Sequence, residues 1–124
     1  MLACAYRNIP IQVMVLILQK SPNVNQQDGC GRSALYLACR AGSIEKVQIL
    51  LQMPGINVNI RTCGGDTPLM AAVTSTNKDM VILCLENNFS PFLYNSIKQN
   101  ARDYAMMLQT SKSEILKLID LAIE

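Results

Sequence analysis

The side chains in this sequence that could carry out chemistry are five cysteines and nine carboxylates, with no histidine to act beside them. The cysteines are odd in number and irregular in spacing, and no Cys-x-x-Cys pair occurs, so neither a disulfide framework nor a four-ligand zinc site is indicated. No nucleophile elbow, phosphate-binding loop or pair of carboxylates on one predicted helix face is found. We therefore predict no catalysis, no metal and no cofactor. The cysteines are Cys4, Cys30, Cys39, Cys63 and Cys84.

The cysteines instead give information on burial and on the cellular compartment. Cys39 and Cys84 lie within apolar helical patterns, where a small thiol packs well. Cys30 and Cys63 lie in predicted turns, where we expect ordinary exposed thiols, with redox-sensitive thiols as the alternative. Because unpaired cysteines are typical of a reducing compartment, we predict an intracellular protein, in the cytoplasm or alternatively in the nucleus.

Length and composition predict a single helical domain over residues 1–124. Half of the residues are hydrophobic, but there is no Trp and there are only two Phe, which suits thin layers of helices better than an aromatic-rich β-sandwich. The net charge is +2 and no two Lys or Arg residues are adjacent, so we do not expect a nucleic-acid partner. The apolar stretch from Ile9 to Leu18 is shorter than the roughly 20 residues of a membrane-spanning helix. We interpret it as a buried helix rather than as a membrane insertion or a signal peptide.

An internal repeat is the strongest pattern in the sequence. Residues 31–38 match residues 65–72 at a displacement of 34, because both segments have a glycine turn followed by a helix start. Val47 falls on Val81 at the same displacement, so the turn and the apolar spacing repeat together. Displacements of 33 extend the pattern to both ends of the chain. The chain therefore divides into four units, at about 1–27, 28–61, 62–94 and 95–124, of which the outer two are imperfect.

Within a unit, the residues predict two antiparallel helices. In the third unit Gly65 supplies the freedom of a tight turn, Thr67 is a good N-cap, and Pro68 suits the first helical position. In the second unit Ser33 takes the cap, and Gly42 interrupts the chain before a second helix. The apolar residues that follow recur at helical spacing, which predicts one buried face on each helix.

This pattern resembles the ankyrin repeat. The resemblance rests on Asp28, Gly31, the run Ser33-Ala34-Leu35-Tyr36 and, most closely, Thr67-Pro68-Leu69-Met70, which differs from the family hallmark Thr-Pro-Leu-His only in its last residue. It covers nearly the whole chain. The resemblance implies an all-α, ankyrin-type solenoid of helix-turn-helix repeats joined by β-hairpin-like loops, such as the segment from Val58 to Gly65.

The chain departs from the family pattern at several positions. The hallmark His, which in the family ties successive turns by hydrogen bonds, is absent from every unit, so we expect an array less stable than a consensus one. Thr76 stands where the family has Gly, and the Pro54-Gly55 turn holds one extra residue. The first unit lacks its hairpin, so its apolar face needs further repeats upstream or a partner to cover it.

We expect the last unit to close the stack. The run Ser111-Lys112-Ser113-Glu114 has the form of a capping box and predicts the start of the final helix. Lys112, Lys117, Asp120 and Glu124 would give that helix a polar outer face. We interpret Met106-Met107-Leu108 as part of the core rather than as a groove for promiscuous binding.

The resemblance implies a non-enzymatic module that binds a partner protein, because a stack of repeats exposes on its concave face the residues that folding does not require. The alternative is a structural or regulatory slice of a larger ankyrin-repeat protein that has no free partner. We expect a monomer unless the uncovered first repeat associates with itself. The family register places these residues on the concave face: Arg7, Asn8, Gln27, Gly29, Cys30, Arg32, Arg40, Ala41, Arg61, Cys63, Gly64, Asp66, Thr74, Ser75, Tyr94, Ser96 and Gln99.

Four arginines on this face suggest that the partner segment is acidic. Residues 1–64 carry six basic and two acidic side chains, whereas residues 65–124 carry five and seven. Arginine makes bidentate contacts with carboxylates and is enriched at interface hot spots. The alternative is that these arginines only keep the surface solvated, since isolated surface charges contribute little. The four are Arg7, Arg32, Arg40 and Arg61.

Overall fold

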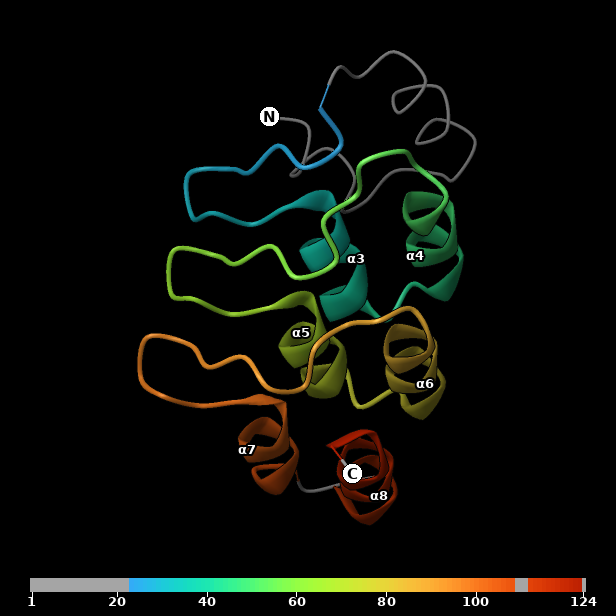
Figure 1. Ribbon diagram of the computed structural model, residues 1–124, viewed down its shortest axis with the longest axis vertical. Helices are drawn as coiled ribbons and strands as arrows, with labels where there is room; N and C mark the ends of the chain where they lie inside the picture. Colours follow the sequence, from blue (N-terminus) through green and yellow to red (C-terminus); the bar gives the residue numbers. More distant parts are fainter. Residues whose placement is uncertain (1–22, 109–111, 124) are drawn as a thin grey trace.

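The computed structural model describes residues 23–108 and 112–123, whose helices form two parallel columns (Figure 1). Helices α3, α5 and α7 form the inner column, and α4, α6 and α8 form the outer column beside it. Helix α5 packs between α3 and α7, and α6 contacts both α4 and α8. Three long loops project from the inner column, and the described residues contain no strand. The helices are α3 (Ala34–Ala41), α4 (Ile44–Leu51), α5 (Pro68–Thr74), α6 (Lys78–Glu86), α7 (Ala101–Met106) and α8 (Lys112–Ile123).

The inner helices begin at the caps that the sequence predicts. The hydroxyl of Thr67 accepts a hydrogen bond from the amide of Met70 at 3.4 Å, and Pro68 is the first residue of α5. Ser33 caps α3 in the same way, and Gly42 ends it in the left-handed conformation, with φ of 73°. In the described residues, α3 with α4 and α5 with α6 therefore have the predicted helix-turn-helix form. The predicted capping box that starts at Ser111 lies outside the described residues.

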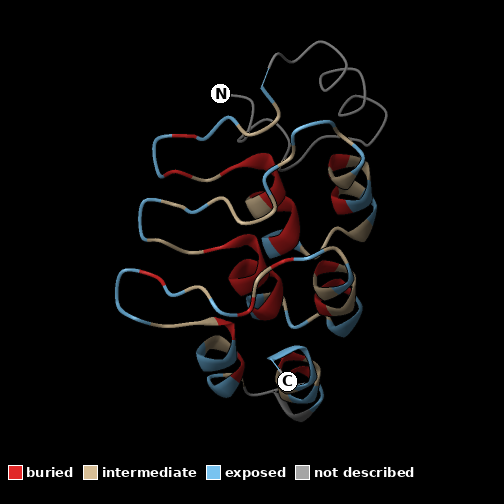
Figure 2. Ribbon diagram, in the orientation of Figure 1, coloured by how far each residue is buried: buried red, intermediate tan, exposed pale blue. Residues whose placement is uncertain are grey.

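The core is an apolar seam between the two columns (Figure 2). Repeat-equivalent residues occupy it: Val47 and Val81, which are 34 positions apart, are both fully buried. The predicted burial of Cys39 and Cys84 is confirmed, and their sulfur atoms are 4.0 Å apart. Burial, followed by the neighbouring Cys84 thiol, raises the pKa of Cys39 well above its usual range, so this thiol stays protonated.

Each projecting loop ends in a tight turn, and we call these turns the finger tips: residues 28–32, 62–66 and 95–99. One backbone hydrogen bond of 2.9–3.0 Å joins the first residue of each tip to the last. The first side chain of each tip also accepts hydrogen bonds from amides within the turn, so a short polar residue there holds the turn closed. These first residues are Asp28, Thr62 and Asn95.

Successive finger tips are in backbone contact. The amide of Cys63 donates to the carbonyl of Cys30 at 3.0 Å, and the amide of Ser96 donates to the carbonyl of Gly64 at 2.9 Å. Gly31 has φ of 76°, and a Cβ atom added there would lie only 2.5 Å from the nitrogen of Cys63. Glycine is therefore required at this position both by the conformation and by the next finger tip.

Asparagine side chains join successive units by hydrogen bonds. The carboxamide oxygen of Asn25 accepts from the amide of Asn57 at 2.8 Å, and that of Asn59 accepts from the amide of Ser90 at 2.9 Å. These two asparagines are 34 positions apart, so the contact repeats with the unit. Met70, which replaces the His, accepts a hydrogen bond from the amide of Thr67 through its sulfur at 3.4 Å.

The prediction that Met106-Met107-Leu108 belongs to the core is wrong for the two methionines, whereas Leu108 is half-buried and packs against the core. The two methionines are 45% and 57% exposed, because α7 turns its buried face, Ala101 and Ala105, toward the stack. On α8, Lys117 is exposed as expected, but so is Leu121, which is 68% exposed. The C-terminal end of the stack is therefore more apolar than the sequence suggested.

Candidate partner-binding groove

Helices α3 and α5 of the inner column expose few side chains. In α5, every residue from Pro68 to Val73 is buried, and only Thr74 at its C-terminal end is exposed. In α3, Tyr36 is half-buried and Arg40 is exposed. The finger tips next to these helices are largely exposed (Figure 2). A small number of side chains therefore determines the chemistry of this face.

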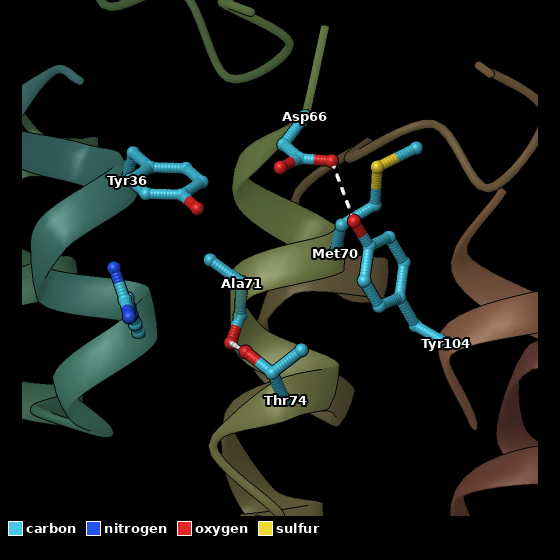
Figure 3. Close-up of a pocket in the computed structure, with 7 residues that line it drawn as sticks. Tyr36, Asp66, Met70, Ala71, Thr74 and Tyr104 are labelled. Carbon is cyan, nitrogen blue, oxygen red and sulfur yellow. Dashed lines mark hydrogen bonds between the residues drawn. The ribbon is translucent and has the colours of Figure 1, made fainter. Parts of the chain in front are cut away.

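A groove of about 520 Å³ lies where the inner helices meet the second finger tip. Three successive units contribute to it, because α3, α5 and α7 each supply at least one side chain (Figure 3). Asp66 lies between the two aromatic rings of the groove, that of Tyr36 on α3 and that of Tyr104 on α7. The lining residues are Tyr36, Arg40, Asp66, Met70, Ala71, Thr74 and Tyr104.

Hydrogen bonds fix the carboxylate of Asp66 in position. The hydroxyl of Tyr104 donates to Oδ1 of Asp66 at 2.7 Å, and Nδ2 of Asn95 donates to the same oxygen at 2.9 Å. Both donors are neutral. In the described part of the chain, no ion pair reaches Asp66 and no hydrogen bond reaches its second oxygen, Oδ2. The groove therefore holds a positioned negative charge with one oxygen available to a ligand.

The negative charge of Asp66 contributes to raised pKa values of both tyrosines. The pKa of Tyr104 is raised to about 12, first by burial and then by the hydrogen bond to Asp66 and its negative charge. The pKa of Tyr36 is also raised by burial and by Asp66, while Arg40 and Arg32 act in the opposite direction. Both phenols are thus neutral near pH 7, and their rings line the groove as uncharged aromatic surfaces.

The groove carries charges of both signs. Arg40 lies one helical turn after Tyr36 on α3, so it lines the groove on the same face of that helix. It is exposed, whereas Asp66 is half-buried. A partner segment that fills the groove would therefore meet a cation and an anion separated by aromatic and small side chains.

The groove brings together three of the residues predicted from sequence: Arg40, Asp66 and Thr74. Tyr36 and Tyr104 were not among the binding residues predicted from sequence. Tyr36 and Met70 stand 34 positions apart, at the place of the hallmark His, and were assigned to the repeat framework rather than to its surface. Tyr36 stands where the family pattern has its hallmark His, and this departure from the pattern could have identified it as a candidate binding residue.

Several predicted residues have structural roles instead. The carboxamide of Gln27 donates to the carbonyls of Gly31 and Arg61, both at 2.7 Å, and so joins the first finger to the next unit. Arg32 forms an ion pair of 2.8 Å with the buried carboxylate of Asp28. Ser75 is the C-cap of α5, and its hydroxyl donates to the carbonyl of Ala72 at 2.6 Å.

The remaining predicted residues lie away from the groove. The structure confirms that Cys30 and Cys63 are exposed free thiols. Arg61 and Tyr94 are exposed on the loops that lead to the second and third tips, and Gln99 closes the third tip. Gly29, Gly64 and Ser96 lie at the tips, and Ala41 ends α3. Arg7 and Asn8 lie outside the described residues.

A second hollow, of about 430 Å³, lies on the outer column between α4 and α6 and is lined by Gln48, Leu51, Gln52, Leu83 and Asn87. It has no charged side chain. Among residues 23–108 and 112–123, no three His, Cys, Asp or Glu side chains are grouped so that they could hold a metal ion. No helix of this part of the chain is long and apolar enough to cross a bilayer.

The chain belongs to the ankyrin-repeat family, because the family profile for ankyrin repeats in three copies matches residues 1–103. It is 34% identical over 76 residues to human SMC5-SMC6 complex localization factor protein 1, and the matched segment covers 61% of this chain and 7% of that protein. It is 35% identical over 94 residues to human BCL-6 corepressor-like protein 1, and the match covers 75% of this chain and 5% of that protein. Human neurogenic locus notch homolog protein 4 is 38% identical to this chain over 65 residues, and the match covers 52% of this chain and 3% of that protein. The chain thus matches only a small part of each of these relatives.

Proposed function

We propose that this chain is a non-enzymatic binding module that holds a segment of a partner protein in the groove between α3, α5 and α7. Ankyrin repeats in general mediate protein–protein interaction. The observation that carries the proposal is that side chains from three successive units line one groove of about 520 Å³, and that three of them, Arg40, Asp66 and Thr74, stand outside the apolar core. A repeat fold by itself specifies a surface rather than a reaction, so function has to be argued from such a surface.

The groove suits a peptide segment better than a small molecule. It is open along the stack, and its lining combines charged, hydroxyl and aromatic groups rather than an enclosed apolar pocket. Tyrosine and arginine, which are enriched at interface hot spots, provide three of its seven side chains. The exposed finger tips extend this surface on one side.

An acidic residue of the partner would fit beside Arg40. We still expect an acidic partner segment, but with only one contact to an arginine in the groove. Arg32 does not contribute there, because it is already paired with Asp28 inside the first finger tip. Arg61 is exposed on the approach to the second tip and could add a second contact. Replacing Arg40 with Glu should therefore weaken partner binding, and the same change at Arg61 should have a smaller effect.

Affinity purification with matched variants tests the proposed groove. Thr74→Arg places a long side chain in the groove at an exposed position, and Gln48→Arg makes the same kind of change in the hollow of the outer column. We expect partners captured from the source cell by the unaltered chain to be lost with Thr74→Arg and retained with Gln48→Arg. Both variants should keep the helical circular dichroism of the unaltered chain. Loss with Gln48→Arg alone would move the binding surface to the outer column and contradict the proposal.

The second candidate is a slice of a longer ankyrin array without a free partner. Two observations favour it: the chain matches 7% or less of the length of the three relatives, and Met106, Met107 and Leu121 are exposed at the end of the stack. Sedimentation of the isolated chain separates the two candidates. A monomer that unfolds cooperatively favours the binding module, whereas self-association that disappears when Met107 and Leu121 are replaced with Lys favours the slice.

A further inference from the structure

Two hydrogen bonds hold the carboxylate of Asp66 in position in the groove. Its Oδ1 accepts hydrogen bonds from Tyr104 at 2.7 Å and from Asn95 at 2.9 Å, and these donors come from the following unit. Asn95 itself is buried and is held by further hydrogen bonds at the third finger tip. The orientation of Asp66 is therefore set by two units before any ligand arrives.

The negative charge of Asp66 has no cation beside it in the part of the chain that the structure describes. The ion pairs there join Arg32 to Asp28, Lys78 to Glu114 and Arg102 to Asp120, and none includes Asp66. Its two hydrogen-bond donors are a phenol and a carboxamide, which orient a carboxylate but do not neutralise it. A half-buried anion of this kind attracts a cationic ligand and repels an anionic one.

The aromatic rings on either side select for the same charge. Tyr36 and Tyr104 stand on opposite sides of Asp66, one from α3 and one from α7 (Figure 3). The face of an aromatic ring carries negative electrostatic potential, so a cation placed over the face of a tyrosine ring is stabilised. Arg40 lines the same groove, one turn after Tyr36 on α3, but no ion pair joins it to Asp66 in the part of the chain that the structure describes.

We propose that Asp66, Tyr36 and Tyr104 form a receptor for one lysine or arginine side chain of the partner segment. The proposal rests on the groove being the binding surface and names the chemistry that one part of it recognises. The basic side chain lies between the two rings and donates to Oδ2 of Asp66. An acidic residue further along the same segment then faces Arg40, so the groove binds one basic and one acidic residue of the partner in a fixed order.

Selection from a displayed library of random linear peptides tests this receptor. The unaltered chain should enrich peptides that share one Lys or Arg at a common position. For a purified peptide of this kind, replacing the basic residue with norleucine should weaken binding to the unaltered chain about tenfold, the combined effect of one partly exposed ion pair and one exposed cation–ring contact. The same replacement should have a clearly smaller effect on binding to Asp66→Asn, which keeps the size of the side chain and leaves only the cation–ring contact.

Matched variants complete the design. Asp79→Asn removes the same charge from an exposed position on α6 and should bind the basic peptide as the unaltered chain does. Tyr104→Phe keeps the ring but removes the hydrogen bond to Asp66, so it should weaken binding less than Tyr104→Ala. Each variant is accepted only if its denaturation midpoint shows that it is folded under the conditions of binding.

The outcomes separate this receptor from the groove itself. If enriched peptides lose binding with Thr74→Arg but bind Asp66→Asn as tightly as the unaltered chain, the groove remains and the basic-residue receptor is refuted. If no peptide is enriched, or if every enriched peptide still binds Thr74→Arg, the groove is not the binding surface and the function proposed above fails as well.

Discussion

Replacing single glycines in the loops with alanine measures how much the contact between finger tips contributes to stability. Gly31 and Gly55 have almost the same backbone conformation, with φ of 76° and 77°. They differ in surroundings: a Cβ atom at Gly31 would lie 2.5 Å from the nitrogen of Cys63, whereas a Cβ atom at Gly55 would have nothing within 4 Å. Gly55→Ala therefore serves as a control for the conformational cost alone.

The two substitutions should destabilise the protein by different amounts. In the left-handed region alanine costs about 1–2 kcal/mol relative to glycine, and part of this is offset because alanine restricts the unfolded chain. We expect Gly55→Ala to lower the free energy of unfolding by about 1 kcal/mol. Gly31→Ala adds the separation of the first two finger tips, with loss of the hydrogen bond from Cys63 to Cys30, so its total should be roughly 2–3 kcal/mol.

Urea denaturation followed by circular dichroism measures both values. The difference of about 1–2 kcal/mol between the variants should appear as a difference of order 1 M in the midpoint. Gly65→Ala should fall between them, because its Cβ atom would lie 3.0 Å from Asn95 Cα, a less severe overlap. Equal losses for Gly31→Ala and Gly55→Ala would refute the reasoning, since only the backbone conformation would then matter.

Three further predictions follow from particular residues. Thr76 has φ of 60°, in a region that a β-branched residue rarely adopts, so Thr76→Gly should raise the free energy of unfolding by about 0.5–1 kcal/mol in urea denaturation; a loss of stability would contradict this. The pKa of Tyr104 is raised to about 12, so its contribution to stability should be complete below pH 10 and be lost as the pH rises toward 12, and Asp66→Asn should lower this pKa in a titration of phenolate absorbance, although burial keeps it raised. An unchanged titration in Asp66→Asn would show that burial alone acts on this phenol. Mass spectrometry after brief alkylation of the folded protein should find modification at Cys30 and Cys63 but not at Cys39 and Cys84, because only the first two are exposed; rapid labelling of Cys39 would show that the core opens readily.

Much of the fold could be predicted from local sequence because each unit contains the signals for its own helices. Thr67 and Pro68 start α5, and Gly42 ends α3, through interactions within a few residues. The displacement of 34 then places equivalent apolar residues in one seam, as Val47 and Val81 show. The error at Met106 and Met107 has the same origin, since an apolar run predicts burial only where a neighbouring unit covers it, and the sequence does not show which face α7 turns inward.

The candidate groove could be predicted only in part. The family register identified Arg40, Asp66 and Thr74 as surface positions, and all three line the groove. It could not distinguish Arg40, which is exposed, from Arg32, whose ion pair with Asp28 holds a finger tip closed. Both are arginines on the same predicted face, and the difference lies in which acidic group is within reach after folding.

The sequence by itself determined the repeat, the caps and the apolar seam, because these depend on interactions between residues near in sequence and on a period that can be counted. Only the tertiary structure decided that Tyr36, Asp66 and Tyr104 meet in one groove, since they belong to three different units and 68 positions separate the first from the last. Their meeting depends on the rotation between successive units, which is set by side-chain packing and by the contacts between finger tips. No local pattern records that rotation.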